Sequence, residues 1–368
     1  MPPQPARSDA PEPPERGSGD NQALPASSLR AANALLGHAL RLTRRPGAGD
    51  ASLLRRVGYA AVALVIAAVV ISLFEGGDAV VQVSINGLVT GGYLALGAVG
   101  LSFVYGILRL VNFAHGDFLT FGAYMTLLLN VSAHVPLVPA ILFGSLMTAA
   151  LSAILELGLW RPLRRRGAAG LQTILATIGL AYLIRYVIQM IAGPDLQQLR
   201  ANDTTGISLG GGVTIGQTIL IATLASYAVL LLVSVGLRYT NIGKQMRALA
   251  DNLSLAETTG LNTARLIMLA WVLGGALAGL AGSLYVLQTG SFDPQFGFNL
   301  LLPLFAAILL GGAGSPYGAI IGGVILGLAE EWSTLFVNAD WQLVVGFGVL
   351  IVTLLVRPEG VFAPAGRV

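Results

Sequence analysis

The stretch QTILIATLASYAVLLLVSVGLRYTNIGKQMRALADNLSLAETTGLNTARLIMLAWVLGGALAGLAGSLYVLQ (residues 217–288) places one polar segment between two long apolar runs. The runs hold about 20 and about 22 residues, and each is long enough to cross a bilayer core of about 30 Å as a helix. The polar segment, residues 238–265, carries the basic residues Arg238, Lys244, Arg247 and Arg265. Because basic residues concentrate on the cytoplasmic side of membrane proteins, the sequence predicts a cytoplasmic loop here.

The loop of residues 238–265 is also patterned as a pair of short helices. Gly243 opens it and Gly260 closes it. The apolar residues between them fall at helical spacing: Met246, Leu249, Leu253 and Ala256. This pattern predicts an amphipathic helix pair that lies at the membrane surface and docks a cytoplasmic partner. The alternative is an ordinary surface loop.

The composition indicates a membrane protein as well. Hydrophobic residues make up 55% of the chain and charged residues 11%, with a mean hydropathy of +0.75, whereas a soluble domain is roughly 25% charged. The 47 glycines suit closely packed transmembrane helices, because small residues let helix backbones approach each other. The absence of cysteine excludes disulfides and thiolate metal sites.

Residues 1–50 form a separate segment, which is expected to be a disordered, basic cytoplasmic tail. The segment is rich in Pro, Ser, Asp and Glu and lacks both apolar periodicity and the apolar run of a signal peptide. Within it, residues 29–45 combine a loose apolar stripe with arginines, which indicates either a helix on anionic lipid or a partly helical tail. Residues 51–368 are predicted to form the transmembrane domain.

From Val57 onward the hydropathy pattern predicts a series of membrane spans. We place them near residues 57–74, 84–108, 111–131, 137–159, 171–192, 217–237, 265–288, 298–311, 317–336 and 341–356. The segment 298–311 is short, so a half-helix or a re-entrant piece is expected there. The predicted fold is an all-α, polytopic transmembrane helical bundle of about 8–10 spans with a cytoplasmic loop that carries helices.

The distribution of charge predicts the orientation of this bundle. With both termini inside, every Lys and Arg except Arg185 and Arg200 falls on the cytoplasmic side. The outer segments instead collect acidic residues: Glu75, Asp78, Asp195, Asp203, Asp293 and Asp340. The positive-inside rule thus predicts a multi-pass membrane protein with cytoplasmic N- and C-termini.

The segment RLVNFAHGDF (residues 109–118) interrupts what would otherwise be one long apolar stretch. A chain reversal or a broken helix is predicted there, with these candidate residues: Asn112, His115, Gly116 and Asp117. A helix that starts near Asn112 would direct free N–H groups at an anion or carboxylate on a translocation path. The alternative is structural: Asn112 caps the helix, and Asp117 pairs with Arg109 at the cytoplasmic interface.

Other charged and small residues inside the spans also need an explanation, because burying them is costly. Glu156 is expected to pair with the RPLRRR cluster, and Arg185 to face the bundle interior or a partner subunit. Glu330 and Glu331 are expected to be solvated. GxxxG pairs predict close helix packing or flexible positions along a gated path: Gly87–Gly91, Gly275–Gly279, Gly314–Gly318 and Gly323–Gly327.

Several kinds of chemistry are excluded by what the sequence lacks. Around Gly243 and Lys244 the spacing is wrong for a phosphate-binding P-loop. The widely spaced histidines His38, His115 and His134 stand outside any HExxH motif, so no metal site is expected. Neither a GxSxG elbow nor a strand pattern is found. We therefore expect a protein that is not an enzyme, with no cofactor and no nucleic-acid partner.

Five blocks of the sequence carry a resemblance to a known family. In chain order they are NGLVTGGYLALGAVGLSFVYGILRLVNFAHGDFLTFGAY (86–124), WRPLRRR (160–166), TILATIGLAYLIR (173–185), GKQMRALADNLSLAETTGLN (243–262) and AAILLGGAGSPYGAIIGGVILGLAE (306–330). In this order the blocks resemble those of the branched-chain amino acid permeases of ABC importers. Residues 243–262 resemble the coupling loop of these permeases. The NFAHGDF and GLNTAR segments are closer to the H-type subunit of the pair than to the M-type.

The resemblance implies a function and a set of partners. The chain would be a permease subunit in a bacterial plasma (inner) membrane, moving branched-chain or other neutral amino acids and powered by separate ATPase subunits. Its partners would be an M-type permease or a second copy of itself, two ATP-binding subunits and an extracytoplasmic solute-binding protein. The ATPase-coupling residues would be Gly243, Arg247, Ala250, Asp251, Asn252, Ala256 and Gly260, the last ending a helix through a left-handed cap.

Other functions stay open on the sequence alone. The same architecture would also serve the import of urea or short amides, which relatives of the family move. An ion-coupled secondary transporter would show inverted repeats and midplane carboxylates, and only Asp117 lies near a helix break. A membrane-embedded enzyme would need a catalytic constellation inside the bilayer, and none converges in the sequence.

Overall fold

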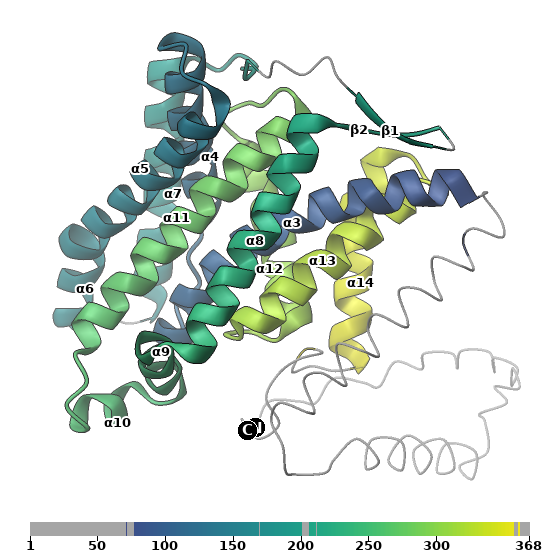
Figure 1. Ribbon diagram of the computed structural model, residues 1–368. Coiled ribbons are helices and arrows are strands. Elements are labelled where there is room, and N and C mark those ends of the chain that lie inside the picture. The colour runs from purple at the N-terminus through teal and green to yellow at the C-terminus, as the bar shows by residue number, and fades with distance from the viewer. Residues whose placement is uncertain are drawn as a thin grey trace, which may run out of the picture. The chain divides into compact units, whose positions relative to one another are not determined.

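A computed structural model describes residues 71, 77–168, 170–200, 206–210, 212–356 and 360. The predicted tail, residues 1–50, and all of the predicted first span except Ile71 lie outside the described residues. The described residues from Gly77 to Val356 form a bundle of helices that cross and pack side by side (Figure 1). The all-α bundle predicted from the sequence is confirmed.

The helices begin and end close to the predicted boundaries of the spans. In chain order they are α3 (Gly77–Leu108), α4 (His115–Leu127), α5 (Leu137–Leu155), α6 (Arg161–Arg165), α7 (Gly170–Ala192), α8 (Gln217–Tyr239), α9 (Asn241–Asp251), α10 (Leu253–Thr258), α11 (Thr263–Thr289), α12 (Phe296–Gly311), α13 (Pro316–Ser333) and α14 (Gln342–Val356). Single π-helical turns, η1 (Leu128–Ser132) and η2 (Glu156–Trp160), extend α4 and α5, and a 3-10 turn, η3 (Ala339–Trp341), precedes α14.

Within the described residues, 5 helices are long and apolar enough to span a membrane, namely α3, α5 with its extension to Arg165, α7, α8 and α11. α12 and α13 together make one more candidate, but they are bent by 118° at the break between them. This agrees with the half-helix or re-entrant piece expected at residues 298–311. The predicted count of about 8–10 spans also included α4 and α14, which are shorter, and a first span outside the described residues.

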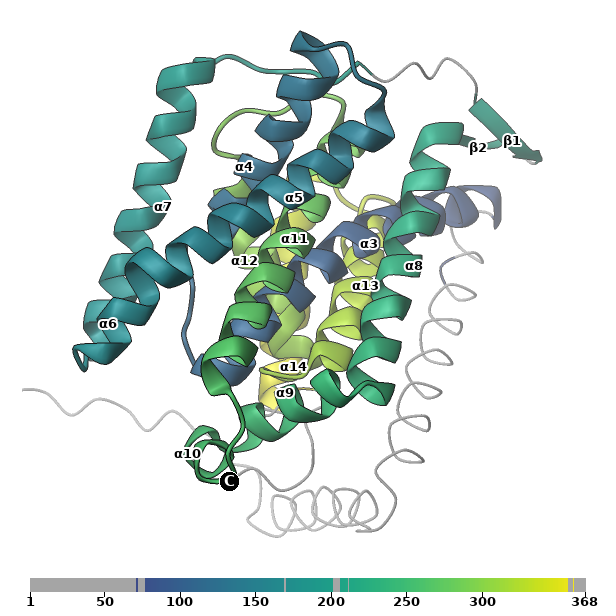
Figure 2. The same ribbon diagram turned by 60° about the vertical axis from the view of Figure 1, so that its left-hand side comes forward.

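α3 lies at the centre of the bundle, between α13 and α11 (Figure 2). In its most apolar window of 18 residues 89% are buried, against 11% in the corresponding window of α8. Its contact with α13 requires glycine: a Cβ at Gly91 would lie 2.9 Å from the Cα of Val324, and a Cβ at Gly327 would lie 2.6 Å from the Cα of Gly91. The close packing predicted for these GxxxG pairs is confirmed.

The helices around α3 turn apolar side chains outward. Leu142 of α5, Leu183 of α7 and Leu232 of α8 are all exposed. In a soluble protein such a surface would cause aggregation, whereas a bilayer solvates it. The outward faces therefore agree with the membrane class that the composition indicates.

A two-stranded hairpin lies before α8, and the sequence did not predict it. β1 (Gly206–Gly210) and β2 (Val213–Gly216) pair antiparallel, and β2 leads directly into α8 (Figure 1). Gly210 and Gly212 have positive φ values, which a tight turn between strands requires. The expectation of no strand is therefore wrong for this segment. The alternation in GISLG and VTIG around a run of glycines is the signal for the hairpin.

Candidate functional site

The polar loop between α8 and α11 folds into the predicted pair of helices, α9 and α10 (Figure 1). The apolar side of the pair packs on the bundle, where Met246, Leu249 and Ala256 are buried. The opposite side is exposed and includes Lys244 and Gln245. The loop is therefore amphipathic, as predicted, with one face fixed to the bundle and one face open.

The start of α9 is fixed by its contacts with the end of α8. Thr240 is the only residue between the two helices, and its Oγ1 accepts a hydrogen bond from the backbone N–H of Gly243 at 3.0 Å. A Cβ at Gly243 would lie 2.5 Å from the Cα of Leu237, so only glycine fits there. The guanidinium of Arg247 donates to the carbonyl oxygen of Leu237. Gly243 and Arg247 thus hold α9 against α8.

Asn252 and Gly260, two of the predicted ATPase-coupling residues, cap the two ends of α10. The Asn252 Oδ1 accepts a hydrogen bond from the N–H of Leu255 at 3.0 Å. After the helix, Gly260 has a φ of 81°, its N–H donates to the carbonyl of Glu257 at 3.1 Å, and the N–H of Leu261 donates to that of Ala256 at 3.3 Å. These two bonds satisfy the last carbonyls of the helix. The left-handed cap predicted at Gly260 is confirmed.

The remaining predicted loop residues lie at the end of α9. Ala250 is half-buried, and Asp251 is exposed beside it. Gly243, Asn252, Ala256 and Gly260 shape the loop, because each is buried or caps a helix. The side chains that a docking partner would meet are the exposed ones, and Asp251 belongs to them.

A groove runs along the side of the loop that faces α11. Its volume is about 310 Å³, and it is lined by Ile242 and Gln245 of α9, by Gly260, Leu261 and Asn262, and by Arg265, Leu266 and Leu269 of α11. The groove combines aliphatic side chains with a cation and amides. It therefore offers a second surface next to the open face of the loop.

The segment 109–118 breaks the chain between α3 and α4, as predicted. α4 begins at His115 with Ala114 as its N-cap residue, so the helix starts later than the predicted start near Asn112. Asn112 is fully buried, and its Oδ1 accepts a hydrogen bond from the N–H of Ala114 at 3.2 Å. Its Nδ2 has no hydrogen-bond partner among the described residues. Asn112 therefore shapes the turn before the helix rather than capping the helix itself.

The first turn of α4 is held by buried contacts with two other helices. The Nε2 atom of His115 lies 2.9 Å from the carbonyl oxygen of Gly97 in α3. Gly116 packs on α12, where a Cβ would lie 2.8 Å from the carbonyl carbon of Gly297. His115 and Gly116 therefore serve packing in this conformation. A role for them on a translocation path stays a prediction.

Asp117 attaches α4 to α7 through a buried ion pair with Arg185. The Arg185 Nε donates to Oδ1 of Asp117 at 2.9 Å, and the Nη2 donates to Oδ2 at 3.1 Å. The guanidinium carbon also lies 4.4 Å from the ring centroid of Phe298 in α12. The predicted pairing of Asp117 with Arg109 is wrong, because Arg109 is exposed at the end of α3. The interior position expected for Arg185 is confirmed.

Two other expectations about buried charges have different outcomes. Glu156 pairs with Arg164 of the RPLRRR cluster, as predicted. Glu331 was expected to be solvated, but it is half-buried, and its Oε1 accepts a hydrogen bond from Thr90 of α3 at 3.0 Å. Glu330 is not exposed either. Thr90 lies far away in the chain, so the sequence gives no local signal for this contact.

Residues 83–354 match the family model described as the permease component of a branched-chain amino acid transport system. The chain belongs to this family. The matched region includes both the α9–α10 loop and the segment 109–118 of this permease. In the part of the permease that the structure describes, there is no group of 3 or more His, Cys, Asp and Glu side chains that could hold a metal ion.

Curated relatives cover most of the permease. It is 31% identical to the high-affinity branched-chain amino acid transport system permease protein LivH of Salmonella typhimurium. The alignment of 294 residues covers 76% of this chain and 94% of the relative. It is 33% identical over an equally long alignment to BraD of Pseudomonas aeruginosa, with the same coverage. Identity to the LivM permease of Escherichia coli is 26%, over 73% of this chain and 67% of the relative. The H-type likeness is thus confirmed. No solved structure matches the chain.

Proposed function

We propose that this permease is the H-type membrane subunit of a binding-protein-dependent ABC importer that moves branched-chain or other neutral amino acids. The observation that carries the proposal is the α9–α10 loop, which has one face fixed to the bundle and one face open. Because the sequence has no P-loop, energy from ATP must reach it through a partner. A rigid loop with an exposed face is suited to receive such a partner.

The open face of the loop, together with the groove beside it, would dock an ATP-binding subunit. Its apolar and charged parts have separate uses: Ile242 and Leu269 in the groove give an apolar surface, while Arg265, Lys244 and Asp251 would set the register of the contact. Arg247 and Gly243 would act indirectly, by holding α9 against α8. Docking of an ATP-binding subunit requires that the loop lie in the cytoplasm. The proposed topology has both termini on the same side.

Two permease subunits would form the pathway, this chain together with an M-type subunit or a second copy of itself. Each would offer its loop to one of two ATP-binding subunits, and an extracytoplasmic binding protein would deliver the amino acid. ATP binding would draw the two loops together and switch the pathway between outward- and inward-facing states. The segment with Asn112, His115, Gly116 and Asp117 would lie on or beside that path. The break that it makes between α3 and α4 would let these helices change their contacts.

Uptake of radiolabelled leucine by proteoliposomes that contain all the subunits tests the transport class. We expect uptake that needs ATP and the loaded binding protein, and that persists when ionophores collapse the ion gradients. Uptake that follows an ion gradient and ignores ATP would instead identify a secondary transporter.

Calorimetry on the binding protein tests the substrate separately. We expect leucine, isoleucine or valine to bind tightly. Tight binding of urea or a short amide, with no heat from leucine, would contradict the amino acid proposal and leave the importer class intact.

A further inference from the structure

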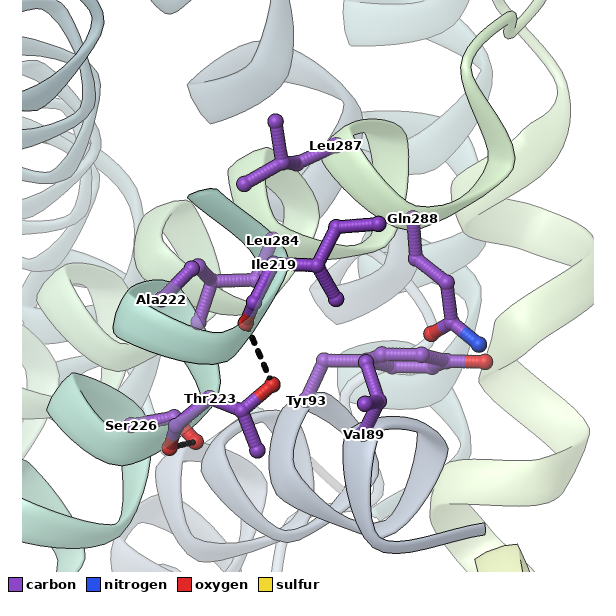
Figure 3. A pocket seen from close by; sticks show the side chains of 9 residues that line it. All are labelled: Val89, Tyr93, Ile219, Ala222, Thr223, Ser226, Leu284, Leu287 and Gln288. Atoms are coloured by element: carbon purple, nitrogen blue, oxygen red, sulfur yellow. Dashed lines mark hydrogen bonds between the residues drawn. The ribbon is translucent and has the colours of Figure 1, made fainter. Parts of the chain in front are cut away.

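A small cavity lies between α3, α8 and α11, at the end of α8 away from the α9–α10 loop (Figure 3). Its walls are mostly aliphatic and include Val89, Ile219, Leu284 and Leu287. None of the described residues that line it is charged. Its accessible volume of about 10 Å³ holds one water molecule.

One polar atom of the Gln288 side chain in this cavity has no hydrogen-bond partner among the described residues. The Gln288 Nε2 donates to Thr90 Oγ1 at 3.0 Å, and that hydroxyl donates to the Glu331 carboxylate at 3.0 Å. This chain of bonds fixes which way the carboxamide points. The other carboxamide atom, Gln288 Oε1, is buried and accepts no hydrogen bond from the described residues. It is therefore an acceptor positioned for a donor that the described residues do not supply.

The other polar side chains around the cavity are the hydroxyl groups of Thr223 and Ser226, which make hydrogen bonds, and the aromatic side chain of Tyr93. Thr223 and Ser226 turn their hydroxyls onto the backbone of their own helix, at 2.7 Å from the carbonyls of Ile219 and Thr223 (Figure 3). The carboxamide of Gln288 lies beside the ring of Tyr93 (Figure 3). An aromatic face next to an unpaired acceptor attracts a cationic donor such as an ammonium group.

We propose that this cavity is a transit site for a neutral, aliphatic amino acid, with the ammonium group at Gln288 Oε1 and the ring of Tyr93. The aliphatic side chain would pack among Ile219, Leu284 and Leu287, and the carboxylate would stay at the open end. Urea has N–H groups that can donate to Gln288 Oε1, but it has no aliphatic group to pack among Ile219, Leu284 and Leu287. The inference rests on the proposed function and names the part of the path that contacts the substrate.

The cavity must widen to admit an amino acid, and the helices that line it are the ones that flank the α9–α10 loop. α8 contributes Ile219 and Thr223 and is joined to α9 by Thr240 alone, while α11 contributes Gln288 and begins directly after the loop. A hydrogen bond of 2.9 Å from the Tyr227 hydroxyl to the Leu88 carbonyl links α8 to α3 on this side. Motion of the loop would therefore be passed to two walls of the cavity.

Cysteine labelling tests the site directly, because the chain has no cysteine of its own. In the complete importer in proteoliposomes, Thr223→Cys is labelled with N-ethylmaleimide, and modification of this chain is followed by mass spectrometry. We expect transported leucine to slow labelling about fivefold or more, which corresponds to substantial occupancy of the site. Leu224→Cys, on the exposed side of the same helix, is the control and should be unaffected.

A second variant removes the acceptor. Gln288→Leu keeps the size of the side chain and should lower leucine uptake about tenfold or more, the loss expected for one hydrogen bond to a charged group. Stimulation of ATP hydrolysis by the loaded binding protein should persist, which excludes misfolding. If the unmodified importer moves leucine but Thr223→Cys is not protected and Gln288→Leu transports normally, the site is refuted and the proposed function stands. If the unmodified importer does not move leucine at all, the proposed function itself fails.

Discussion

Asp117 and Arg185 show what single residues contribute to this bundle. Their side chains are 0% and 8% exposed, and the two hydrogen bonds between them are bidentate. A bidentate charged pair has good geometry, but loss of one partner leaves the other charge buried and uncompensated. The pair therefore makes the attachment of α7 to α4 sensitive to any change on either side.

Replacing one partner of this pair should destabilise the protein strongly. Arg185→Leu is expected to lower the free energy of unfolding by about 3–5 kcal/mol, because Asp117 loses its counter-charge. The double variant with Asp117→Asn should recover a large part of this loss. Thermal unfolding in detergent measures both. Arg165→Gln, at an exposed position, is the control and should change stability by about 0–1 kcal/mol. Equal losses in the single and double variants would contradict the role of the pair.

The residue scale also shows where prediction from the sequence stops. A charged side chain inside an apolar span needs a reason, so the sequence predicts that Arg185 is buried in the bundle. Its partner, Asp117, lies 68 positions away in the chain, and no local pattern selects Arg185 over Arg109 as the partner of this carboxylate. The contact of Glu331 with Thr90 was missed for the same reason. Only the packing of the helices decides such pairs.

At the scale of elements, the two capped ends of α10 give the α9–α10 loop a defined shape. Gly260 has a φ of 81°, and apart from its two chain neighbours no described residue lies within 4 Å of the place where a Cβ would stand. A side chain at this position would therefore meet a backbone penalty and no steric clash. This makes Gly260 a clean test of the geometry of the loop.

Gly260→Val should impair the stimulation of ATP hydrolysis by the loaded binding protein, while membrane insertion stays intact. The expected cost of the left-handed conformation for a residue with a Cβ is roughly 1–2 kcal/mol. Gly260→Asn, which tolerates this conformation better, should retain most of the stimulation. Normal coupling in the valine variant would remove the geometric reason for glycine here.

The contact between α3 and α13 supports a second prediction at this scale. Gly91→Ala should lower the free energy of unfolding by about 1–3 kcal/mol, because the new Cβ overpacks the interface with Val324. Gly179→Ala is the matched control, since no described residue outside its own helical turn lies within 4 Å of its Cβ position in α7. There alanine should stabilise the helix by about 0.5–1 kcal/mol. Thermal unfolding of both variants in detergent gives the comparison. If alanine changed the free energy of unfolding in the same direction at both positions, the packing argument would be contradicted.

Elements were the most predictable part of this molecule. Spans such as α7 and α11 begin and end within a few residues of the predicted limits, because length and hydropathy fix them. The hairpin of β1 and β2 escaped prediction, since its strands are very short and rich in glycine. The late start of α4 also escaped it, because Asn112 bonds to Ala114 before the helix begins.

At the scale of the whole molecule, the orientation in the membrane is the property to test. We propose that the α9–α10 loop lies in the cytoplasm and the β1–β2 hairpin outside, as the positive-inside rule predicts. Ser254→Cys in α10 should therefore react with an impermeant thiol reagent only in inside-out vesicles. Ser208→Cys in β1 should react only in right-side-out vesicles. Both serines are exposed, so accessibility to solvent does not differ between them. The reverse pattern would invert the proposed topology.

The single residue between α8 and α9 has a mechanical consequence. With one residue as connection, α8 and α9 meet at a corner, which Gly243 and Arg247 brace, and we expect the two helices to move as rigid arms. A helix of 23 residues such as α8 is about 34 Å long, so a tilt of about 10° at one end displaces the other by about 6 Å. A displacement of that size is larger than one carbon–carbon contact distance of about 3.5–4.0 Å. A small rotation imposed on the loop would thus be amplified along α8 into a large opening at its far end.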